Sequence, residues 1–327
     1  MSPTDVSVVI PVHNRLAFLR QALDSVAEQT APAREVIVVD DGSTEDIAGG
    51  IGDHRCRPRV VRQLRRGPAA ARNRGIEAAG GEWIAFLDSD DLWMPQKLER
   101  FLEEVGKRPD INIFYGPMLP IDADGRPMSG RSKPRHDGWI TELLFESCFV
   151  DVPTVLCRRT LLDRCGGFDA GLAVCEDYDL WLRISLAEPF GLVPEPLARR
   201  RLHADRLSKQ DMSRNLRVKA EVLERFLARP DVNGKIPSRV AASRLARVCF
   251  VAGRSAYAQG QYHEAMECCR KSRRFGPAPF RTWLLSTAAA TRSWLSGNGN
   301  GNGEAEGAHV KRRAGARVAG GRTPPRS

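Results

Sequence analysis

Two groups of acidic side chains have the spacing that metal binding and proton transfer require. Asp88, Asp90 and Asp91 stand together directly after an apolar run, and Asp177 follows Glu176 at the start of an amphipathic segment. Carboxylates at the end of one strand can hold a divalent cation against phosphate oxygens, and Mg²⁺ and Mn²⁺ accept such oxygen ligands. A separate carboxylate can take a proton from an attacking hydroxyl. Each group alone also fits a simpler interpretation, a solvated turn or an acidic helix N-terminus.

The elements that must position these carboxylates alternate between strands and helices. Apolar runs typical of buried strands occur at Val6 to Ile10, Val36 to Val39 and Trp83 to Leu87, with apolar residues at helical spacing between them. This alternation predicts an α/β fold with parallel strands joined by crossover helices. In such open sheets ligands bind beyond the carboxyl ends of the strands, which is where Asp40 and the Asp88 group stand. Shorter strand candidates follow at Ile111 to Tyr115, Val155 to Cys157 and Leu197 to Leu202.

The last third of the chain is predicted to be helical and then disordered, without further strands. Residues 1–208 are expected to form the catalytic domain, and residues 209–295 an all-helical region of three helices. Within that region, Gly253 to Pro277 is spaced like one tetratricopeptide hairpin, which cannot bury its own face, so we expect packing first and partner binding as the alternative. Residues 296–327 are Gly/Asn-rich and then basic, and are expected to be disordered.

Composition excludes several classes of protein. The 327 residues are 42% hydrophobic and 28% charged, as in soluble globular proteins, and no apolar run approaches the roughly 18 residues that a membrane span needs. The first residues lack the pattern of a signal peptide, so a cytoplasmic location is expected. The eight cysteines form no CxxC pair, which favours reduced thiols over disulfides or a zinc site.

Part of the net charge of +10 comes from basic residues near the end of the chain. Six positive charges, from Lys311 to Arg326, follow the last acidic residue, Glu306. This distribution favours a solvated tail that touches anionic lipid at the inner face of the membrane. We therefore expect no nucleic-acid partner.

Five motifs occur in one order along residues 5 to 205. They are PVHN at Pro11 to Asn14, VVDDGS at Val38 to Ser43, GPAAARNRGI at Gly67 to Ile76, FLDSDD at Phe86 to Asp91 and CEDYDLWLR at Cys175 to Arg183. The set resembles the family 2 glycosyltransferases. The resemblance implies the GT-A fold, a Rossmann-like mixed and mostly parallel sheet flanked by helices. It also implies an inverting, hexosyltransferase-type enzyme of polysaccharide biosynthesis, which moves a sugar from a UDP-linked donor to an acceptor hydroxyl.

Several residues carry over to the nucleotide-sugar donor. Asp40 resembles the residue that hydrogen-bonds the base, and a carboxylate there discriminates between bases because a wrong base leaves it unpaired. For its neighbours Asp41 and Ser43 we favour a turn and a helix cap. Arg72 could instead be a solvated helix side chain. The full donor set that the resemblance implies is Pro11, Val12, Asp40, Arg72, Asn73, Asp88 and Ser89.

The remaining predicted positions bind the metal, accept the proton or bind the acceptor. By resemblance Asp90 and His203 would hold Mn²⁺ or Mg²⁺, and Asp177 would be the general base. Glu176 and Trp181 would bind the acceptor, since an aromatic face suits a sugar ring. A core role for Trp181 fits the sequence equally well.

Two alternatives were weighed against the inverting transferase. A sugar nucleotidyltransferase would need a glycine-rich loop after the first strand, where this chain has PVHN. A non-catalytic nucleotide-sugar-binding or helical-repeat interaction protein would not need both Asp90 and Asp177. The expected partners are therefore a nucleotide-sugar donor and a glycan, lipid-linked or protein acceptor.

Overall fold

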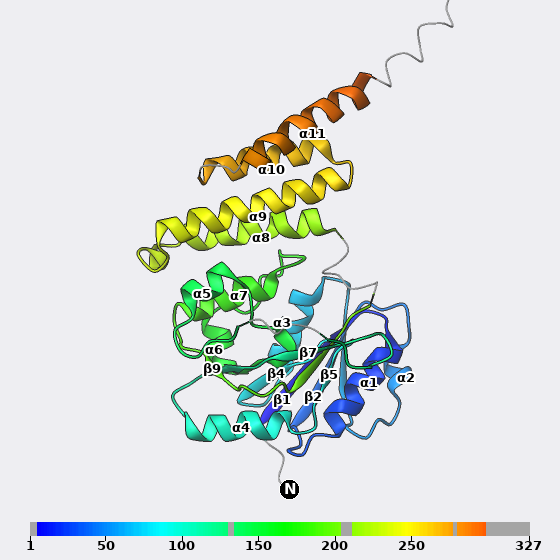
Figure 1. Ribbon diagram of the computed structural model, residues 1–327. Coiled ribbons are helices and arrows are strands. Elements are labelled where there is room, and N and C mark those ends of the chain that lie inside the picture. The colour runs from blue at the N-terminus through cyan, green and yellow to red at the C-terminus, as the bar shows by residue number, and fades with distance from the viewer. Residues whose placement is uncertain (1–4, 130–133, 204–210, 277–279, 299–327) are drawn as a thin grey trace, which may run out of the picture.

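The chain folds into a central sheet, a small second sheet and a stack of C-terminal helices (Figure 1). The computed structural model describes residues 5–129, 134–203, 211–276 and 280–298. Across the central sheet the strands run in the order β3 (Arg59–Gln63), β2 (Glu35–Asp41), β1 (Val6–Val12), β4 (Trp83–Phe86), β8 (Leu156–Arg158), β6 (Ile113–Tyr115) and β9 (Gly191–Leu192). The second sheet has the order β5 (Leu92–Trp93), β10 (Ala198–Arg201) and β7 (Met118–Ile121).

The pairing in the central sheet is mixed and mostly parallel, so the predicted fold class is confirmed. Strand β1 is parallel to β2 and to β4, and β2 is parallel to β3. Strand β8 is antiparallel to its neighbours β4 and β6, while β9 is parallel to β6. The chain moves outward from β1 to β3 and then returns to β4 on the other side of β1. This reversal opens a crevice beyond the carboxyl ends of β1 and β4.

Helices cover both faces of the central sheet, because alternate side chains of each strand point to opposite faces. In β1, Val6, Val8 and Ile10 belong to one core and Val9 belongs to the other. The first core is closed by α1 (Leu16–Ala27), α2 (Ile47–Ile51) and α4 (Lys97–Lys107). The second is closed by α3 (Pro68–Ala78), α5 (Thr141–Glu146), α6 (Arg159–Arg164) and α7 (Glu176–Ser185).

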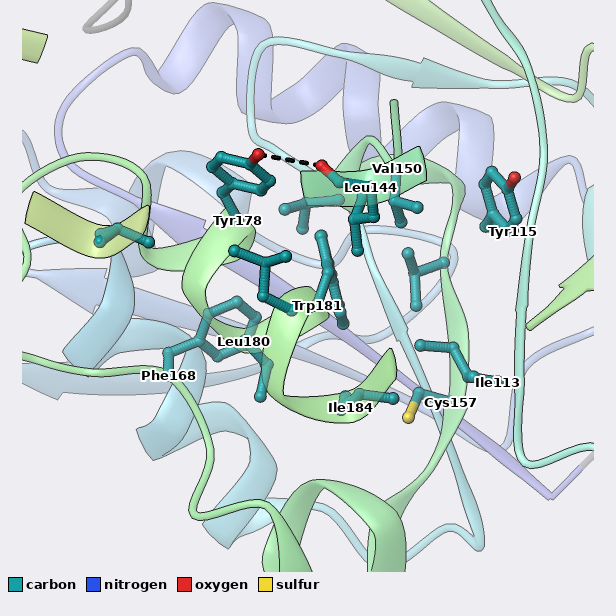
Figure 2. Packing of buried hydrophobic residues seen from close by; sticks show 14 of the residues in the cluster. Ile113, Tyr115, Leu144, Val150, Cys157, Phe168, Tyr178, Leu180, Trp181 and Ile184 are labelled. Atoms are coloured by element: carbon teal, nitrogen blue, oxygen red, sulfur yellow. Dashed lines mark hydrogen bonds between the residues drawn. The ribbon is translucent and has the colours of Figure 1, made fainter. Parts of the chain in front are cut away.

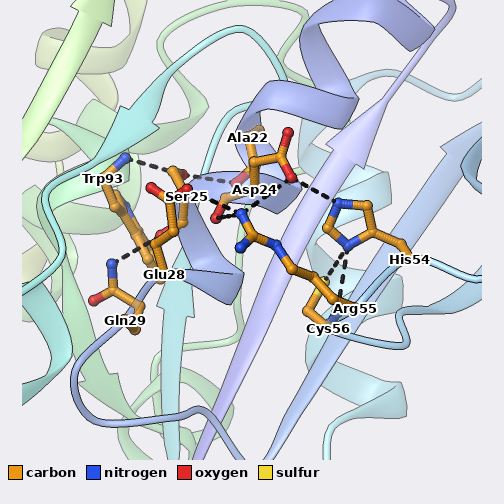
Figure 3. A network of polar contacts seen from close by, with 9 residues as sticks. All are labelled: Ala22, Asp24, Ser25, Glu28, Gln29, His54, Arg55, Cys56 and Trp93. Atoms are coloured by element: carbon orange, nitrogen blue, oxygen red, sulfur yellow. Dashed lines mark hydrogen bonds and ion pairs between the residues drawn. The ribbon is translucent and has the colours of Figure 1, made fainter.

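Helix α1 also anchors the short strand that follows the acidic segment. The backbone N–H of Trp93 in β5 donates to Ser25 Oγ of α1 at 3.1 Å (Figure 3). On the same helix Asp24 pairs with Arg55 at 3.3 Å, which ties the helix to the loop before β3. The turn at Asp88–Asp91 is therefore held between β4 on one side and an anchored β5 on the other.

Within the described residues, four α-helices follow the sheets, one more than the sequence predicts. They are α8 (Met212–Leu227), α9 (Ser238–Ala258), α10 (Tyr262–Arg274) and α11 (Phe280–Asn298), stacked in chain order (Figure 1). Helices α8 and α9 share the core of the α5 and α7 layer, and the rings of Phe145 and Phe226 lie 6.0 Å apart. At the α9–α10 crossing, a Cβ on Gly253 would lie 3.1 Å from the Ala265 carbonyl oxygen, so a small residue permits the close approach.

The end of the helical region differs from the prediction in one respect. Helix α11 continues to Asn298, into the segment predicted as a disordered tail. The rest of that tail, with Lys311 to Arg326, lies outside the described residues, and its disorder and lipid contact stay predictions. Among the residues that the structure describes, no helix is both long and apolar enough to cross a bilayer.

The positive charge is not mainly a property of that tail. Residues 211–298 contain 16 Lys and Arg against six Asp and Glu, whereas residues 1–203 contain 26 against 31. The helical region is thus strongly basic, and the part that holds the acidic motifs is acidic. Together these two regions are only weakly basic, because the acidic and the basic region largely offset each other.

Candidate functional site

The carboxyl ends of β1 and β2 form the first wall of the site. Pro11 and Val12 end β1, and Val12 stands in register with Asp40 of β2. The next residues, Asn14 and Arg15, have φ angles of 59° and 64° and turn the chain sharply. This arrangement brings the residues predicted to hold the nucleotide base to one place.

Asp40 is buried near the carboxyl end of β2, with 2% of the residue exposed. Its Oδ1 accepts the backbone N–H of Ser43 at 2.8 Å, and its Oδ2 lies 3.5 Å from Arg62 Nε. The adjacent Asp41 accepts the backbone N–H groups of Arg66 and Gly67, both at 2.8 Å, and so fixes the loop that enters α3. Contact between Asp40 and a base stays a prediction.

Arg72 of α3 joins the two acidic groups. Its side chain is 6% exposed, so the solvated alternative is wrong. Nη2 donates to Asp88 Oδ1 at 2.8 Å and Nη1 donates to Glu176 Oε1 at 2.7 Å. Burial lowers the pKa of Arg72, but the two carboxylates outweigh that effect and hold it above its ordinary value. The end of β4 and the start of α7 therefore meet at one guanidinium.

Asp177 lies next to this bridge, in the first turn of α7, and is half-buried. Burial, and then the charge of Glu176, raise the pKa of Asp177 to about 7, against the opposing effect of Arg72. Its Oδ1 accepts the backbone N–H of Tyr178 at 2.7 Å. A carboxylate that titrates near neutrality is suited to accept a proton from a hydroxyl.

Asp90 and His203, the predicted metal ligands, are neighbours in the structure. His203 Nε2 lies 2.8 Å from Asp90 Oδ2, and the same oxygen accepts from Arg15 Nη1 at 3.0 Å. Within the described ranges, no three His, Cys, Asp or Glu side chains form a group that could hold a metal. A carboxylate and an imidazole nevertheless fit Mn²⁺ or Mg²⁺, because such ions take further ligands from substrate phosphates.

Arg201 is a positioning residue that the sequence motifs missed. It is fully buried, its Nε donates to the carbonyl of Asp90 at 3.0 Å, and its Nη2 donates to Gln21 Oε1 at 2.7 Å. Its backbone N–H donates to Asp91 Oδ1 at 2.9 Å. Three consecutive arginines, 199–201, in a predicted strand were the available signal, because buried strands seldom carry charges without partners.

Trp181 does not reach the cleft, so its prediction as an acceptor-binding residue is wrong. Its ring is completely buried among core residues and meets Phe168 edge-on at 6.0 Å (Figure 2). The reason is the path of α7, whose residues from Tyr178 to Ile184 pass into the core after the first turn. The core alternative is the correct one.

Asn73 is also used differently from the prediction. Its Nδ2 donates to the carbonyl of Phe168 at 2.7 Å, and its Oδ1 accepts the N–H of Phe168 at 2.9 Å. Both amide groups thus hold the turn before Phe168 and are not directed at a donor. Asp88 and Glu176 both pair with Arg72, and Ser89 is buried in the acidic turn. Their contacts with substrate stay predictions.

Comparison with known proteins agrees with this geometry. The family model "Glycosyl transferase family 2" matches residues 7–164. An uncharacterized glycosyltransferase of Haemophilus influenzae is 30% identical over 210 residues, covering 62% of this chain and 70% of that protein. The chain belongs to glycosyltransferase family 2.

The matches to other relatives of this family 2 glycosyltransferase span different shares of the relatives' lengths. WfgD of Escherichia coli, named a UDP-Glc:alpha-D-GlcNAc-diphosphoundecaprenol beta-1,3-glucosyltransferase, is 31% identical over 182 residues, 55% of this chain and 69% of WfgD. An uncharacterized glycosyltransferase of Rickettsia bellii is 34% identical over 205 residues, 61% of this chain, but the match spans only 29% of that longer protein.

The fold of the transferase is that of a solved GT-A enzyme. The structure of S. aureus TarS 1-349 in complex with UDP-GlcNAc superimposes with a TM-score of 0.63 at 18% identity, covering 89% of this chain and 92% of TarS 1-349. The predicted GT-A fold is confirmed, and the similarity extends into the C-terminal helices.

Proposed function

We propose that this chain is an inverting glycosyltransferase that moves a sugar from a nucleotide diphosphate sugar, UDP-linked, to an acceptor hydroxyl. The observation that carries the proposal is the Arg72 bridge between Asp88 and Glu176, because it brings the acidic turn and the start of α7, where Asp177 lies, to one place. The donor class is supported by TarS, solved with UDP-GlcNAc and with UDP, and by the name of WfgD.

The chemistry that we assign to the chain is a single displacement. Asp177 takes the proton of the acceptor hydroxyl while the new carbon–oxygen bond forms and the bond to the diphosphate breaks on the opposite face. Glu176 and Arg72 fix the start of α7 and set the pKa of Asp177. The ends of β1 and β2, with Asp40, hold the nucleotide.

Asp90 and His203 are the residues that would hold Mn²⁺ or Mg²⁺. Their converging oxygen and nitrogen atoms supply two donors, and diphosphate oxygens would complete the shell. When bound, the ion neutralises the charge that grows on the departing diphosphate. Arg15 adds a positive charge on the same side, and Arg201 keeps the Asp90 backbone in place.

We propose that the acceptor is a glycan, a lipid-linked glycan or a protein. The transferred sugar would be a hexose, and the reaction would belong to polysaccharide assembly. The lipid-linked diphosphate in the name of WfgD supports the second of these classes. The basic tail, residues 299–327, would hold such an enzyme at the inner face of the membrane by peripheral contact.

The test is donor turnover by the full chain. Purified protein with Mn²⁺ is expected to release UDP from one of UDP-glucose, UDP-galactose or UDP-N-acetylglucosamine, and faster with a lipid-linked glycan extract. Asp177→Asn should lower kcat by about 10³-fold while UDP affinity stays within about threefold, since only the proton acceptor is removed. Asp163→Asn, on an exposed residue of α6, is the matched control and should not change kcat.

Removal of the metal should stop turnover in the same assay. Excess chelator is expected to abolish UDP release, and added Mn²⁺ or Mg²⁺ to restore it, because the diphosphate charge is otherwise unopposed. Unchanged turnover in chelator would remove Asp90 and His203 from the proposed role. Tight UDP binding without any turnover, with or without metal, would instead favour a non-catalytic nucleotide-sugar-binding protein.

A further inference from the structure

A second charged cluster lies beside the cleft and has no part in the reaction as proposed. Asp151 precedes the short 3-10 turn Val152–Thr154 and forms ion pairs through both carboxylate oxygens. Oδ2 pairs with Arg135 Nη2 at 3.0 Å, and Oδ1 pairs with Arg200 of β10. The side chains of Arg135 and Asp151 are 9% and 15% exposed. Two guanidinium groups thus share the carboxylate of Asp151.

Arg135 has hydrogen-bond donors that the described part of the chain does not use. Its Nε and Nη1 are buried, and neither has a partner within that part. A buried donor without a partner costs about 1–3 kcal/mol, and more when it is charged. A ligand that accepts these two hydrogen bonds would remove that cost.

The backbone beside Arg135 is held by the half of the central sheet that lies away from β1 and β2. The residue next to Arg135, His136, is held by Tyr115 of β6, whose hydroxyl donates to the His136 carbonyl at 2.7 Å and accepts its N–H at 2.9 Å. Strand β6 lies on the side of β4 opposite to β1 and β2. The guanidinium is therefore supported from the half of the sheet that carries no residue assigned to the base.

The same cluster is within electrostatic reach of the groups assigned to the reaction. The charge of Asp151 is one of the influences that raise the pKa of Asp177. Burial lowers the pKa of Arg200, but the charge of Asp151 and the smaller effects of Asp91 and Asp88 raise it above its ordinary value. The geometry agrees, because Arg200 pairs with Asp151 and its neighbours in β10 lie against the acidic turn, Arg199 opposite Leu92 and the Arg201 N–H on Asp91 Oδ1.

We propose that Arg135 and Arg200 bind an oxyanion of the acceptor, a phosphate or a carboxylate, and so turn the acceptor hydroxyl toward Asp177. The inference rests on the proposed function, because it takes Asp177 as the base. Arg135 Nε and Nη1 are charged donors without partners in the described part of the chain, and guanidinium groups bind phosphate and carboxylate oxygens through such donors. The acceptor class is therefore an anionic glycan, or a glycan carried on a phosphate.

The experiment measures oxyanion binding to the full chain already saturated with UDP and Mg²⁺. Methyl phosphate and acetate are titrated separately and followed by ligand-detected NMR. We expect saturable binding of one probe to the wild type, and the tighter probe names the acceptor's group. Arg135→Gln should weaken that binding about tenfold or more with UDP affinity unchanged, as expected for the loss of one charged hydrogen-bonding group.

Two further variants make the test independent of simple misfolding. Asp151→Asn removes the competing carboxylate and should strengthen probe binding, a sign that a merely structural role would not produce. Arg126→Gln changes an arginine that pairs with Asp124, has a 76% exposed side chain and lies in the same connecting segment, so it should leave binding unchanged.

Several results would overturn the inference. One is the absence of saturable binding of either probe to a wild-type chain that binds UDP. Another is an Arg135→Gln variant that loses UDP affinity as strongly as probe affinity, since the cluster would then belong to the donor. A chain that binds no UDP at all contradicts the proposed function itself, so the two failures are distinguishable.

Discussion

In the proposed mechanism a single residue, Asp177, sets the pH dependence of turnover. Its pKa is raised to about 7 by burial and by Glu176, and a general base works only when it is deprotonated. The logarithm of kcat/KM should therefore rise with a slope of about one up to about pH 7 and level off above it. A pH series of initial rates for UDP release checks this. A profile that is flat between about pH 5 and 8 would contradict Asp177 as the base.

Residue types could be predicted from the sequence better than side-chain directions. The family resemblance predicts Asp90, His203 and Asp177 as site residues, and the structure brings the first two within 2.8 Å of each other. Trp181 was misassigned because the face it presents depends on how α7 enters the core, which is a tertiary property. Asn73 was misassigned because its amide finds a backbone partner far away in sequence, at Phe168.

At the scale of elements, the loop before Phe168 depends on that amide. Gly167 has a φ of +64°, and a Cβ there would lie 2.8 Å from Asn73 Oδ1, so the turn is fitted closely around this side chain. Asn73→Ala should therefore lower the free energy of unfolding by about 1–3 kcal/mol, because it leaves buried backbone groups of Phe168 unpaired. UDP affinity should stay unchanged, in contrast to the original assignment of Asn73 to the donor.

Urea unfolding and UDP titration measure the two quantities. Asn233→Ala, at an exposed position after α8, serves as the control and should leave both within experimental error. A drop in UDP affinity of about tenfold in Asn73→Ala, with stability retained, would instead return Asn73 to the donor site.

Strands with continuous apolar runs were predicted, as were the shorter strands β6, β8 and β10, but the shortest strands were not. Strands β1, β2 and β4 carry continuous apolar runs, and α1 and α4 carry clear apolar faces. Strands β5 and β9 have two residues each and leave no pattern to detect. The small sheet therefore emerges only from tertiary pairing, although it holds β10 and Arg201 against the acidic turn.

At the scale of the whole molecule, α8 and α9 are part of the catalytic core. Val222, Leu223 and Phe226 of α8 and Leu245 of α9 belong to the same buried cluster as α5 and α7. A chain ended after residue 210 should expose this apolar surface. It should therefore either precipitate or melt at a temperature about 10 °C or more lower. A chain ended after Asn298 should melt within about 2 °C of the full protein.

Thermal unfolding followed by circular dichroism compares the two truncations. A chain ended after residue 210 that melts like the full protein would show that the helices contribute nothing to the stability of the sheet. The domain boundary at residue 208 was placed where the composition changes. Composition alone could not reveal the shared core, because the contacts between α5, α7, α8 and α9 join distant parts of the chain.

The shared interior also limits how this enzyme can be re-engineered. A chimera that joins the catalytic half to another protein's helices at the change of composition would cut through a continuous apolar interior. The turn at Gly260, between α9 and α10, is a better junction, since Ala256, Ala265 and Ala289 form a small apolar cluster there that is separate from the core shared with α5 and α7. A cassette exchanged there would leave the apolar layer behind Asp177 untouched.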